Sequence, residues 1–548
     1  MSIVVRSTDS PTGTMAQAVF EFDHSHEASH ADLVQLLGGK GAGLAEMTTA
    51  LGISVPPGFT ISVPVCKTYF AEGWPAGLSD VLATHVTTLG DRMGRRLGDP
   101  ADPLLVAVRS GAPISMPGML DTVLNLGLND DTVVGLAAVS GSPAFAWDSY
   151  RRFLAMYAVS VMGIDAELLS EAVGVVDGVE HHVQSLKSAI LRLAGRPVPS
   201  DPTQQLREAV EAVFRSWNSS RAQTYREREG IDPALGTAVT VQAMVFGNRG
   251  DSSGTGVVFT RNPATGENAL YGDYLPRAQG EDVVAGTART MHIADLEQLH
   301  PDVYRLLQKT LRRLEIHFRD MCDVEFTVEE NKLWLLQTRS GKRGSSAAVR
   351  IAVDMANDPE IALSVPEVLD RVPVEMRDRA RAEAVAHVAD ESSGPCVITK
   401  GLGASPGRAV GRVVLTSDAA ADADTDVILV RPETSPEDVA GMSASVGLLT
   451  TKGGLVSHAA VVARGWGIPA VVGAHELSFS AQGLTDSTGN IIREGDIITI
   501  DGTTGCVWLG EVAGPSSDAV QKLIEHELPE LILLEQWASS HAMNGAVK

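Results

Sequence analysis

Hydrophobic and polar positions change their spacing several times along the chain. Between about Leu33 and Thr338, short runs rich in β-branched residues are bounded by Gly, Pro or Asp, which is typical of strands. Examples are Leu104 to Val108, Ala238 to Val245 and Gly256 to Thr260. Between them the spacing becomes helical, as in SYRRFLAMYAVSVMG and QQLREAVEAVFRSW. We therefore predict an α/β domain over residues 21–343 with a helical insert at about 143–227.

A second set of strand signals follows a more polar stretch. Residues 344–395 are rich in Ala, Asp, Glu and Arg and include MRDRARAEAVAHVA, so we predict a helical connector. The runs VGRVVL, DVILV, VGLLTT, AVVG and DIITID then predict a compact domain over 396–512. We expect a flexible tail at 1–20 and a C-terminal linker helix at 513–548. The predicted fold class is multidomain α/β (α+β).

Composition narrows the class of protein. A chain of 548 residues suggests three or four domains of roughly 100 to 200 residues each. No apolar run approaches the roughly 18 to 20 residues that a spanning helix needs, and the start lacks the pattern of a signal or transit peptide. We therefore expect a cytoplasmic protein with no membrane contact. A formal charge of −24 argues against nucleic-acid binding, and the four cysteines, none in a C-x-x-C pair, are expected to be free thiols.

The sharpest local feature is the string GGLVSHAAVVARG, which starts at Gly453. A predicted strand runs into the pair Gly453-Gly454, Ser457 occupies an N-cap position, and the residues that follow favour a helix. His458 is thus predicted in the first helical turn, where unpaired N–H groups favour bound phosphate and disfavour an imidazolium. A neutral imidazole is a nucleophile, so the position suits a phosphoryl carrier. A single histidine at such a turn is more often a packing residue, and the string alone leaves both interpretations open.

Two upstream motifs place single cations beside predicted strand ends. LLGGKGAGLAEM, from Leu36 to Met47, combines a glycine-rich turn, Lys40 and the start of a helix, which can bring N–H groups and a cation to phosphates. It lacks the Walker A pattern, and an ordinary turn with a surface lysine is the plainer alternative. Arg109 ends an apolar strand, where a permanent charge is costly unless it meets an anion. A structural salt bridge explains Arg109 equally well.

Two alternating runs between Asp323 and Arg339 predict a hairpin. With a three-residue loop, Glu325 would lie opposite Gln337 and Asp323 opposite Arg339, on one face of the sheet. Two acids, an amide and a guanidinium could hold Mg²⁺ and nucleotide phosphates. A solvated, salt-bridged sheet face is the alternative.

Taken in order, these strings resemble the front half of the pyruvate, phosphate dikinase family. The resemblance covers nearly the whole chain and includes GG-x-x-SHAAVVARG-x-G, VRSG-x-x-x-SMPGMLDT, VQAMVFGN, GTGVVFTRNP, YGDYL-x-x-AQGEDVVAG and RPETSPED. It implies an ATP-grasp-type nucleotide-binding domain and a swivelling β/β/α phosphohistidine domain. The implied activity is ATP- and phosphate-dependent phosphorylation of His458, giving AMP and pyrophosphate.

The same resemblance implies roles for individual residues. Lys40, Arg109 and Arg339 would neutralise ATP phosphates, and Asp323, Glu325 and Gln337 would serve Mg²⁺ and the nucleotide. Further nucleotide-site residues would be Glu281 and Asp282, and the phosphohistidine loop would contain Gly453, Gly454 and Ser457.

Three features depart from the family pattern. Val456 stands where a threonine is usual, so control by phosphorylation at that position is not expected. Gly467-Ile468-Pro469-Ala470 is closer to phosphoenolpyruvate synthases and the sugar phosphotransferase system. The barrel that binds pyruvate or phosphoenolpyruvate in the family has no counterpart in this sequence. The resemblance leaves two alternatives open: a separate polypeptide supplies the barrel, or the chain is a truncated or repurposed form. A homodimer is a further expected partner state. The alternatives are a phosphotransferase with another acceptor, synthase-like or antibiotic-modifying, and a non-catalytic nucleotide-sensing or phosphocarrier partner.

Overall fold

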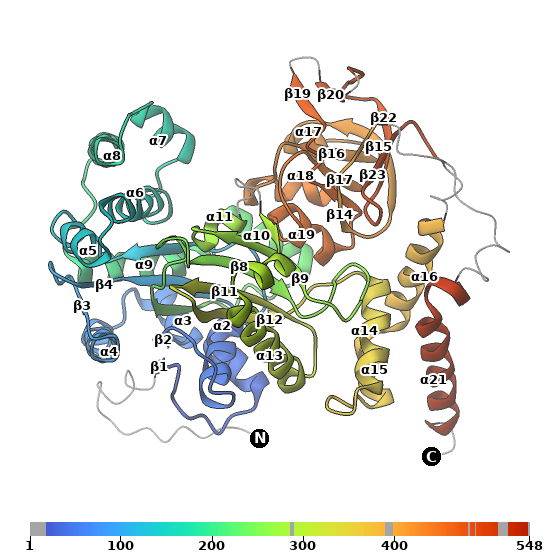
Figure 1. The fold of residues 1–548 in the computed structure, drawn as a ribbon, viewed down its shortest axis with the longest axis horizontal. Helices are drawn as coiled ribbons and strands as arrows, with labels where there is room; N and C mark the ends of the chain where they lie inside the picture. The colour runs from blue at the N-terminus through green and yellow to red at the C-terminus, as the bar shows by residue number, and fades with distance from the viewer. Residues whose placement is uncertain are drawn as a thin grey trace. The chain divides into compact units, whose positions relative to one another are not determined.

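The computed structural model describes residues 18–284, 290–388, 398–480, 483–487, 489–512 and 524–545. Most of the expected tail at 1–20, the end of the expected connector at 389–395 and part of the expected linker at 513–523 lie outside these ranges. Figure 1 shows the helices and strands along the chain. The chain divides into two compact units: residues 1–249 with 334–337, and residues 250–333 with 338–548. The predicted domain boundaries remain a prediction.

The first unit is built on an antiparallel five-stranded sheet. Its strands, in spatial order, are β1 (Val19–Glu21), β2 (Gly58–Ile61), β7 (Ala238–Ala243), β5 (Val106–Gly111) and β6 (Thr122–Leu126). The interior strands β2, β7 and β5 are largely buried, and β7 is buried along its whole length. Their sequences, GFTI, AVTVQA and VAVRSG, are accordingly rich in apolar and β-branched residues.

Helices pack around this sheet and fill the chain between β6 and β7. The first three are α2 (His30–Thr49), α3 (Val63–Glu72) and α4 (Leu78–Met93), with the short strands β3 (Arg96–Leu97) and β4 (Pro103–Leu104) after them. Between β6 and β7 follow α5 (Thr132–Ser140), α6 (Pro143–Ser160), α7 (Ala166–Val173), α8 (Val179–Ala194), α9 (Pro202–Ser216) and α10 (Ser220–Glu229). The apolar faces of α3 to α9 join the strands in one core, and α2 forms a separate small apolar cluster.

The second unit contains another five-stranded antiparallel sheet. Its order is β10 (Met291–His292), β9 (Tyr271–Pro276), β8 (Gly254–Phe259), β11 (Cys322–Glu329) and β12 (Lys332–Ser340), and the middle of β12 is grouped with the first unit. The helices α11 (Gly280–Val284), α12 (Leu296–Leu299) and α13 (Pro301–Phe318) belong to this region. The turn between β11 and β12 holds Glu330 and Asn331, both at positive φ. The expected three-residue loop is therefore wrong, because both residues adopt the left-handed conformation of a two-residue turn.

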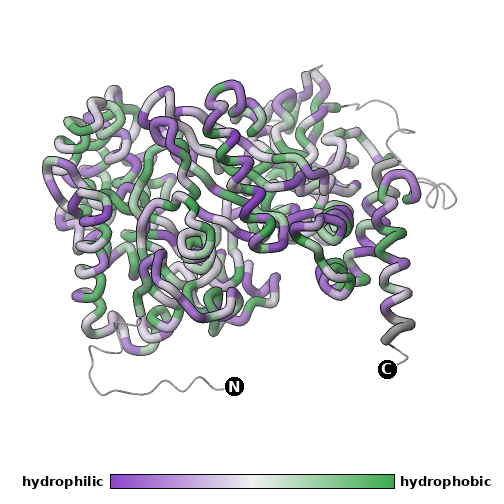
Figure 2. The backbone as a smooth tube through the Cα atoms, turned by 60° about the horizontal axis from the view of Figure 1, so that its bottom comes forward, coloured by the Kyte–Doolittle hydropathy of each residue, from purple (hydrophilic) through white to green (hydrophobic). Residues whose placement is uncertain are grey.

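A helical cluster in the second unit joins distant parts of the sequence. It contains α14 (Ser345–Asn357), α15 (Val365–Arg371), α16 (Val374–Val388) and α21 (Pro529–Gly545). Hydrophobic and hydrophilic residues alternate along α21 (Figure 2), and Leu531 and Leu534 are fully buried in the shared core.

The remaining part of the second unit is an eight-stranded mixed sheet. Its order is β13 (Thr399–Lys400), β23 (Cys506–Leu509), β22 (Ile497–Asp501), β15 (Arg408–Val414), β16 (Val427–Arg431), β17 (Gly447–Thr450), β18 (Ala470–Val472) and β14 (Leu402–Ser405). The strands from β15 to β18 are parallel, and α17 (Ser417–Ala421), α18 (Val439–Ala444) and α19 (His458–Trp466) connect them. A small sheet of β19 (Ser478–Ser480), β20 (Gly483–Thr485) and β21 (Ile491–Ile492) is appended.

The fold is thus a mixed α/β multidomain arrangement, as the hydrophobic pattern predicts. Cys66 and Cys322 are buried free thiols, but Cys506 is disulfide-bonded, so the expectation of free thiols is wrong for that residue. None of the helices in the described ranges combines the length and apolar character that crossing a membrane requires.

Candidate active site

A kink in α2 carries Lys40 to the end of β5. Gly38 has φ 68° and ψ 166° inside an otherwise regular helix, and a Cβ there would lie 1.6 Å from the carbonyl oxygen of Gly111. The Gly39 N–H donates to Ala112 O at 2.9 Å, which holds the kink against the chain that leaves β5. Only glycine fits this contact and this backbone conformation. The helix therefore restarts beside the end of β5.

Arg109 lies on β5, close to the same corner of the first unit. It pairs with Thr240 on β7 and with Thr122 on β6, so its strand is held from both sides. Two residues further along β5, a Cβ at Gly111 would come within 3.4 Å of Lys40 Cβ. The structure thus brings the segments of Lys40 and Arg109 together in one corner, the Lys40–Arg109 corner, where two cations can meet an anionic ligand.

Acidic side chains collect on one face of the β9–β8–β11 sheet. Asp273 on β9 pairs with Val257 on β8, which pairs with Glu325 on β11. In the next row of the same face, Tyr271 pairs with Phe259, which pairs with Asp323. The alternation of side chains along strands places all six on one side, which we call the acidic face. Sequence reasoning assigned Asp323 and Glu325 but missed Asp273 and Tyr271, which lie in the quoted string YGDYL.

Asp323 and Arg339 form an ion pair at the edge of the acidic face. Arg339 Nε donates to Asp323 Oδ2 at 2.7 Å, so these two predicted residues do lie together. Burial raises the pKa of Asp323, and the guanidinium of Arg339 opposes this rise. The other carboxylate oxygen, Oδ1, is buried without a hydrogen-bond partner in the described structure. An oxygen in this state is suited to accept a metal ion or a proton.

The other predicted nucleotide-site residues occupy separate places. Glu281 and Asp282 lie in the short helix α11, where the Asp282 carboxylate accepts the Gln279 N–H at 2.9 Å. Gln337 is buried in the part of β12 that groups with the first unit. Lys40, Arg109 and Gln337 thus belong to the first unit, while Asp323, Glu325, Arg339, Glu281 and Asp282 belong to the second.

His458 is the first residue of α19, as the sequence predicts. β17 leads into a glycine turn in which Gly453 has φ 93°, and Ser457 then caps the helix by accepting the Ala460 N–H at 3.5 Å. The N–H groups of the first turn and the positive end of the helix dipole therefore lie at the end of α19 that carries His458.

The surroundings of His458 keep its ring neutral and orient it. Burial lowers its pKa to about 4, although the nearby carboxylates of Asp438 and Glu437 act in the opposite direction. Its Nδ1 lies 3.2 Å from Thr434 Oγ1, while its Nε2 is buried without a partner in the described part of the chain. When Nδ1 carries the proton and donates to Thr434, Nε2 offers its lone pair. Thr434 was missed as a site residue, although it belongs to the quoted string RPETSPED.

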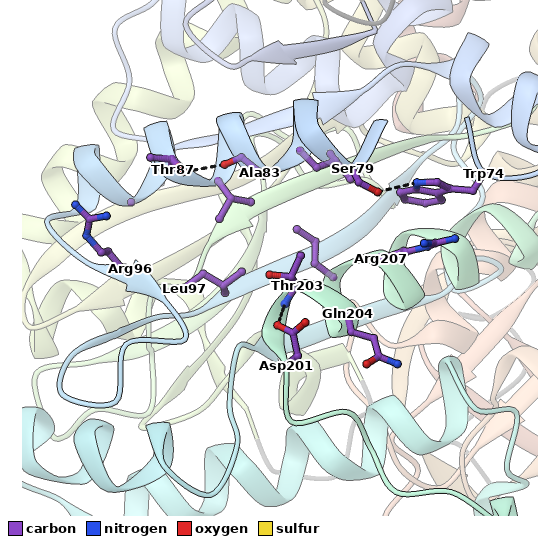
Figure 3. A pocket seen from close by; sticks show the side chains of 14 residues that line it. Trp74, Ser79, Ala83, Thr87, Arg96, Leu97, Asp201, Thr203, Gln204 and Arg207 are labelled. Atoms are coloured by element: carbon purple, nitrogen blue, oxygen red, sulfur yellow. Dashed lines mark hydrogen bonds between the residues drawn. The ribbon is translucent and has the colours of Figure 1, made fainter. Parts of the chain in front are cut away.

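A pocket of about 490 Å³ in the first unit is lined by none of the predicted site residues (Figure 3). It lies between α4 and the start of α9 and includes Arg96 and Arg207 among apolar side chains. Trp74 Nε1 donates to Ser79 Oγ at 3.1 Å, and the Arg207 guanidinium lies 5.0 Å from the Trp74 ring. Neither Lys40 nor Arg109 lines this pocket, so we do not assign the nucleotide to it.

Two sequence families match most of the chain. The family described as pyruvate phosphate dikinase, AMP/ATP-binding domain, matches residues 34–74, 74–298 and 289–359. The family described as PEP-utilising enzyme, mobile domain, matches residues 423–505, which include His458.

Curated relatives agree with these matches. The chloroplastic pyruvate, phosphate dikinase of Flaveria pringlei is 45% identical over 531 residues, covering 93% of this chain and 55% of the relative. Pyruvate, phosphate dikinase 2 of Oryza sativa subsp. japonica is 46% identical over 529 residues, covering 92% and 58%. Pyruvate, phosphate dikinase of Rhizobium meliloti (strain 1021) is 46% identical over 531 residues, covering 91% and 58%. The chain spans little more than half the length of these relatives.

Proposed function

This chain belongs to the pyruvate phosphate dikinase family, and from that membership we propose that it phosphorylates its own His458 with ATP and phosphate. In the overall step, ATP, inorganic phosphate and the neutral histidine give AMP, pyrophosphate and phosphohistidine. The β-phosphorus of ATP ends on the imidazole, and the γ-phosphorus leaves in pyrophosphate with the added phosphate. We further propose that the nucleotide-binding part is of the ATP-grasp type and that the His458 domain swivels between sites.

The observation that carries this proposal is the state of His458. A ring whose pKa is lowered to about 4 is neutral near pH 7, and its Nε2 has no partner among the described residues to compete for the lone pair. A buried histidine with only a packing role gains nothing from a polar atom left unpaired, because such an atom costs about 1 to 3 kcal/mol. We therefore assign Nε2 as the phosphoryl acceptor.

The proposed nucleotide site uses the remaining predicted residues. Lys40, Arg109 and Arg339 would neutralise the phosphates, and Asp323, Glu325 and Gln337 would serve Mg²⁺ and the nucleotide, with Glu281 and Asp282 as further contributors. No group of three or more His, Cys, Asp or Glu residues among those described could hold a metal by itself. That fits Mg²⁺, which typically takes one or two carboxylates and completes its shell with phosphate oxygens and water. When bound, Mg²⁺ would neutralise charge on the transferring phosphates.

The final acceptor is proposed from the family. Pyruvate would take the phosphoryl group from His458 and give phosphoenolpyruvate. The relatives are named for pyruvate and phosphate, and the family matched at His458 is described as PEP-utilising.

The test is acid-labile labelling of the protein by ATP that carries the tracer in either the β or the γ position. The reaction contains Mg²⁺ and is run with and without phosphate. We expect stable label from the β position with phosphate present, and none in His458→Ala. Labelling from neither position, despite measured ATP binding, would refute the proposal.

A further inference from the structure

Arg464 is a buried cation in the same helix as His458. Its side chain is 2% exposed, and its two terminal nitrogens donate to the carbonyl oxygens of Ala404 and Leu455, each at 2.7 Å. Leu455 belongs to the loop that leads into α19, three residues before His458. Arg464 therefore fixes one carbonyl of the loop that sets the direction of the helix start.

The hydrogen bonds of Arg464 within its own sheet do not compensate its charge. Both acceptors are neutral carbonyls, and burial lowers the pKa of the guanidinium. The opposing influences come from Tyr271, Asp323 and Asp273, all on the acidic face. A buried cation is tolerated only where opposite charge or a polarisable partner is near.

The ring of Phe259 supplies a direct contact on that face. The Arg464 guanidinium lies 5.4 Å from the centroid of Phe259, within the range of a cation–π interaction. Phe259 is 1% exposed and pairs with Asp323 and Tyr271 in the sheet. One guanidinium therefore contacts both the loop before His458 and the centre of the acidic face.

The neighbouring loop residues are seated on the same surface. Val456 is 4% exposed and belongs to one apolar cluster with Phe259 and Tyr271. A Cβ at Gly454 would lie 2.8 Å from Asp273 Oδ2, so the backbone of the loop packs directly against the Asp273 side chain with no room for a side chain at position 454. The loop is therefore closely packed on this face, and Arg464 holds the same loop through the carbonyl oxygen of Leu455.

We propose that Arg464 is a positioning residue for His458. Its contact with Phe259 holds the 453–457 loop against the acidic face, and its hydrogen bond to Leu455 O in that loop fixes the orientation of His458. The inference rests on the proposed role of His458 as phosphoryl acceptor. It predicts that transfer from bound ATP depends on the Arg464–Phe259 contact, whereas the intrinsic reactivity of the imidazole does not.

The test compares two phosphoryl donors in Arg464→Lys and Phe259→Leu. Phosphoramidate is a small donor that needs no nucleotide site, so its rate reports the histidine alone. We expect each variant to slow single-turnover labelling from β-labelled ATP by about 10- to 100-fold, the range that misplacement of about 1 Å can cause. Labelling by phosphoramidate and the Kd for ATP should stay within about twofold. Arg412→Lys is the matched control, since Arg412 is an exposed arginine that donates to Gly495 O in the same sheet region.

Two results would overturn the proposal. A parallel fall in both rates would mean that Arg464 only maintains the fold of α19, and unchanged ATP rates would mean that the contact is idle. Hydrogen exchange at the amides of residues 455 and 456 in nucleotide-free protein gives a readout that does not need ATP chemistry. We expect it to rise at least tenfold in Phe259→Leu, and an unchanged rate would refute the coupling even if wild-type protein took no label from ATP.

Discussion

The Lys40–Arg109 corner and the His458 loop both contain a glycine at positive φ before a helix start, but the side chain that follows is a cation in one and a neutral imidazole in the other. In each, a glycine at positive φ leads into a helix start: Gly38, φ 68°, precedes Lys40, and Gly453, φ 93°, precedes His458. At the corner the glycine lets the backbone reach Gly111, which brings the segments of Lys40 and Arg109 together. At the loop, burial removes charge from the side chain that follows. A glycine turn before a helix therefore does not specify the chemistry, and the residue placed after it does.

The largest effect is expected where the loop carries its reactive group. His458→Ala removes the acceptor nitrogen, so acid-labile label from ATP should disappear completely while ATP binding remains. Protein-bound label after reaction with ATP, Mg²⁺ and phosphate measures this. His526→Ala, which changes a histidine whose side chain is 85% exposed, should label like wild type. Retained label in His458→Ala would move the acceptor elsewhere.

ATP binding at the Lys40–Arg109 corner should be most sensitive to substitution of Gly38. Gly38→Ala places a Cβ 1.6 Å from Gly111 O, so α2 must shift and Lys40 with it. We expect ATP affinity to fall by about 10- to 100-fold, because a hydrogen bond from the displaced Lys40 to a charged phosphate would contribute roughly 1.5 to 3 kcal/mol. Isothermal titration with ATP measures this.

Gly52→Ala is the matched control for that substitution. Gly52 also has positive φ, 55°, but a Cβ added there would meet no atom within 4 Å. The substitution should cost only about 1 kcal/mol of stability, from backbone strain, and leave ATP affinity unchanged. Equal effects of the two substitutions on ATP affinity would show that strain, and not the close approach to Gly111, matters at the corner.

The pH dependence of folding stability tests whether His458 is buried as a neutral ring. His458 has a pKa of about 4 in the folded protein against 6.5 when unfolded, so protonation favours unfolding. This contribution to stability is present above about pH 6.5 and is lost as the pH falls through about 4. The difference between the two pKa values sets an upper bound of roughly 3 to 4 kcal/mol on this contribution. Urea unfolding at pH 7 and pH 4.5 should show a smaller loss in His458→Asn than in wild type, and identical losses would contradict the burial argument.

The smallest effect is expected from substitution of Thr434, whose hydroxyl lies beside the His458 ring. Thr434→Val removes the hydroxyl that lies 3.2 Å from His458 Nδ1 but keeps the shape of the side chain. One such hydrogen bond is worth about 1 kcal/mol, so labelling from ATP should slow by about fivefold. Single-turnover rates measure this, with Thr434→Ser expected to restore most of the rate. A valine variant that labels at the wild-type rate would remove Thr434 from the site.

Local features of the fold and site were predictable from the sequence, and through-space features were not. Ser457 and the glycines before it identify the start of α19, because capping depends on neighbours in the chain. The hairpin between Asp323 and Arg339 was predictable, but its two-residue turn depends on Glu330 and Asn331 both adopting positive φ, which their residue types do not require. Asp273 and Arg464 lie far apart in sequence, and only the three-dimensional structure brings Arg464 against Phe259 and within electrostatic reach of Asp273.

The most direct test of the central claim identifies the nitrogen that carries phosphorus. Protein with ¹⁵N-labelled histidine is treated with ATP, Mg²⁺ and phosphate, and the product is examined by ³¹P and ¹⁵N NMR. We predict a phosphorus–nitrogen bond at Nε2 of His458, with Nδ1 still protonated beside Thr434. Phosphorus at Nδ1, or no phosphohistidine while ATP is bound, would contradict the account.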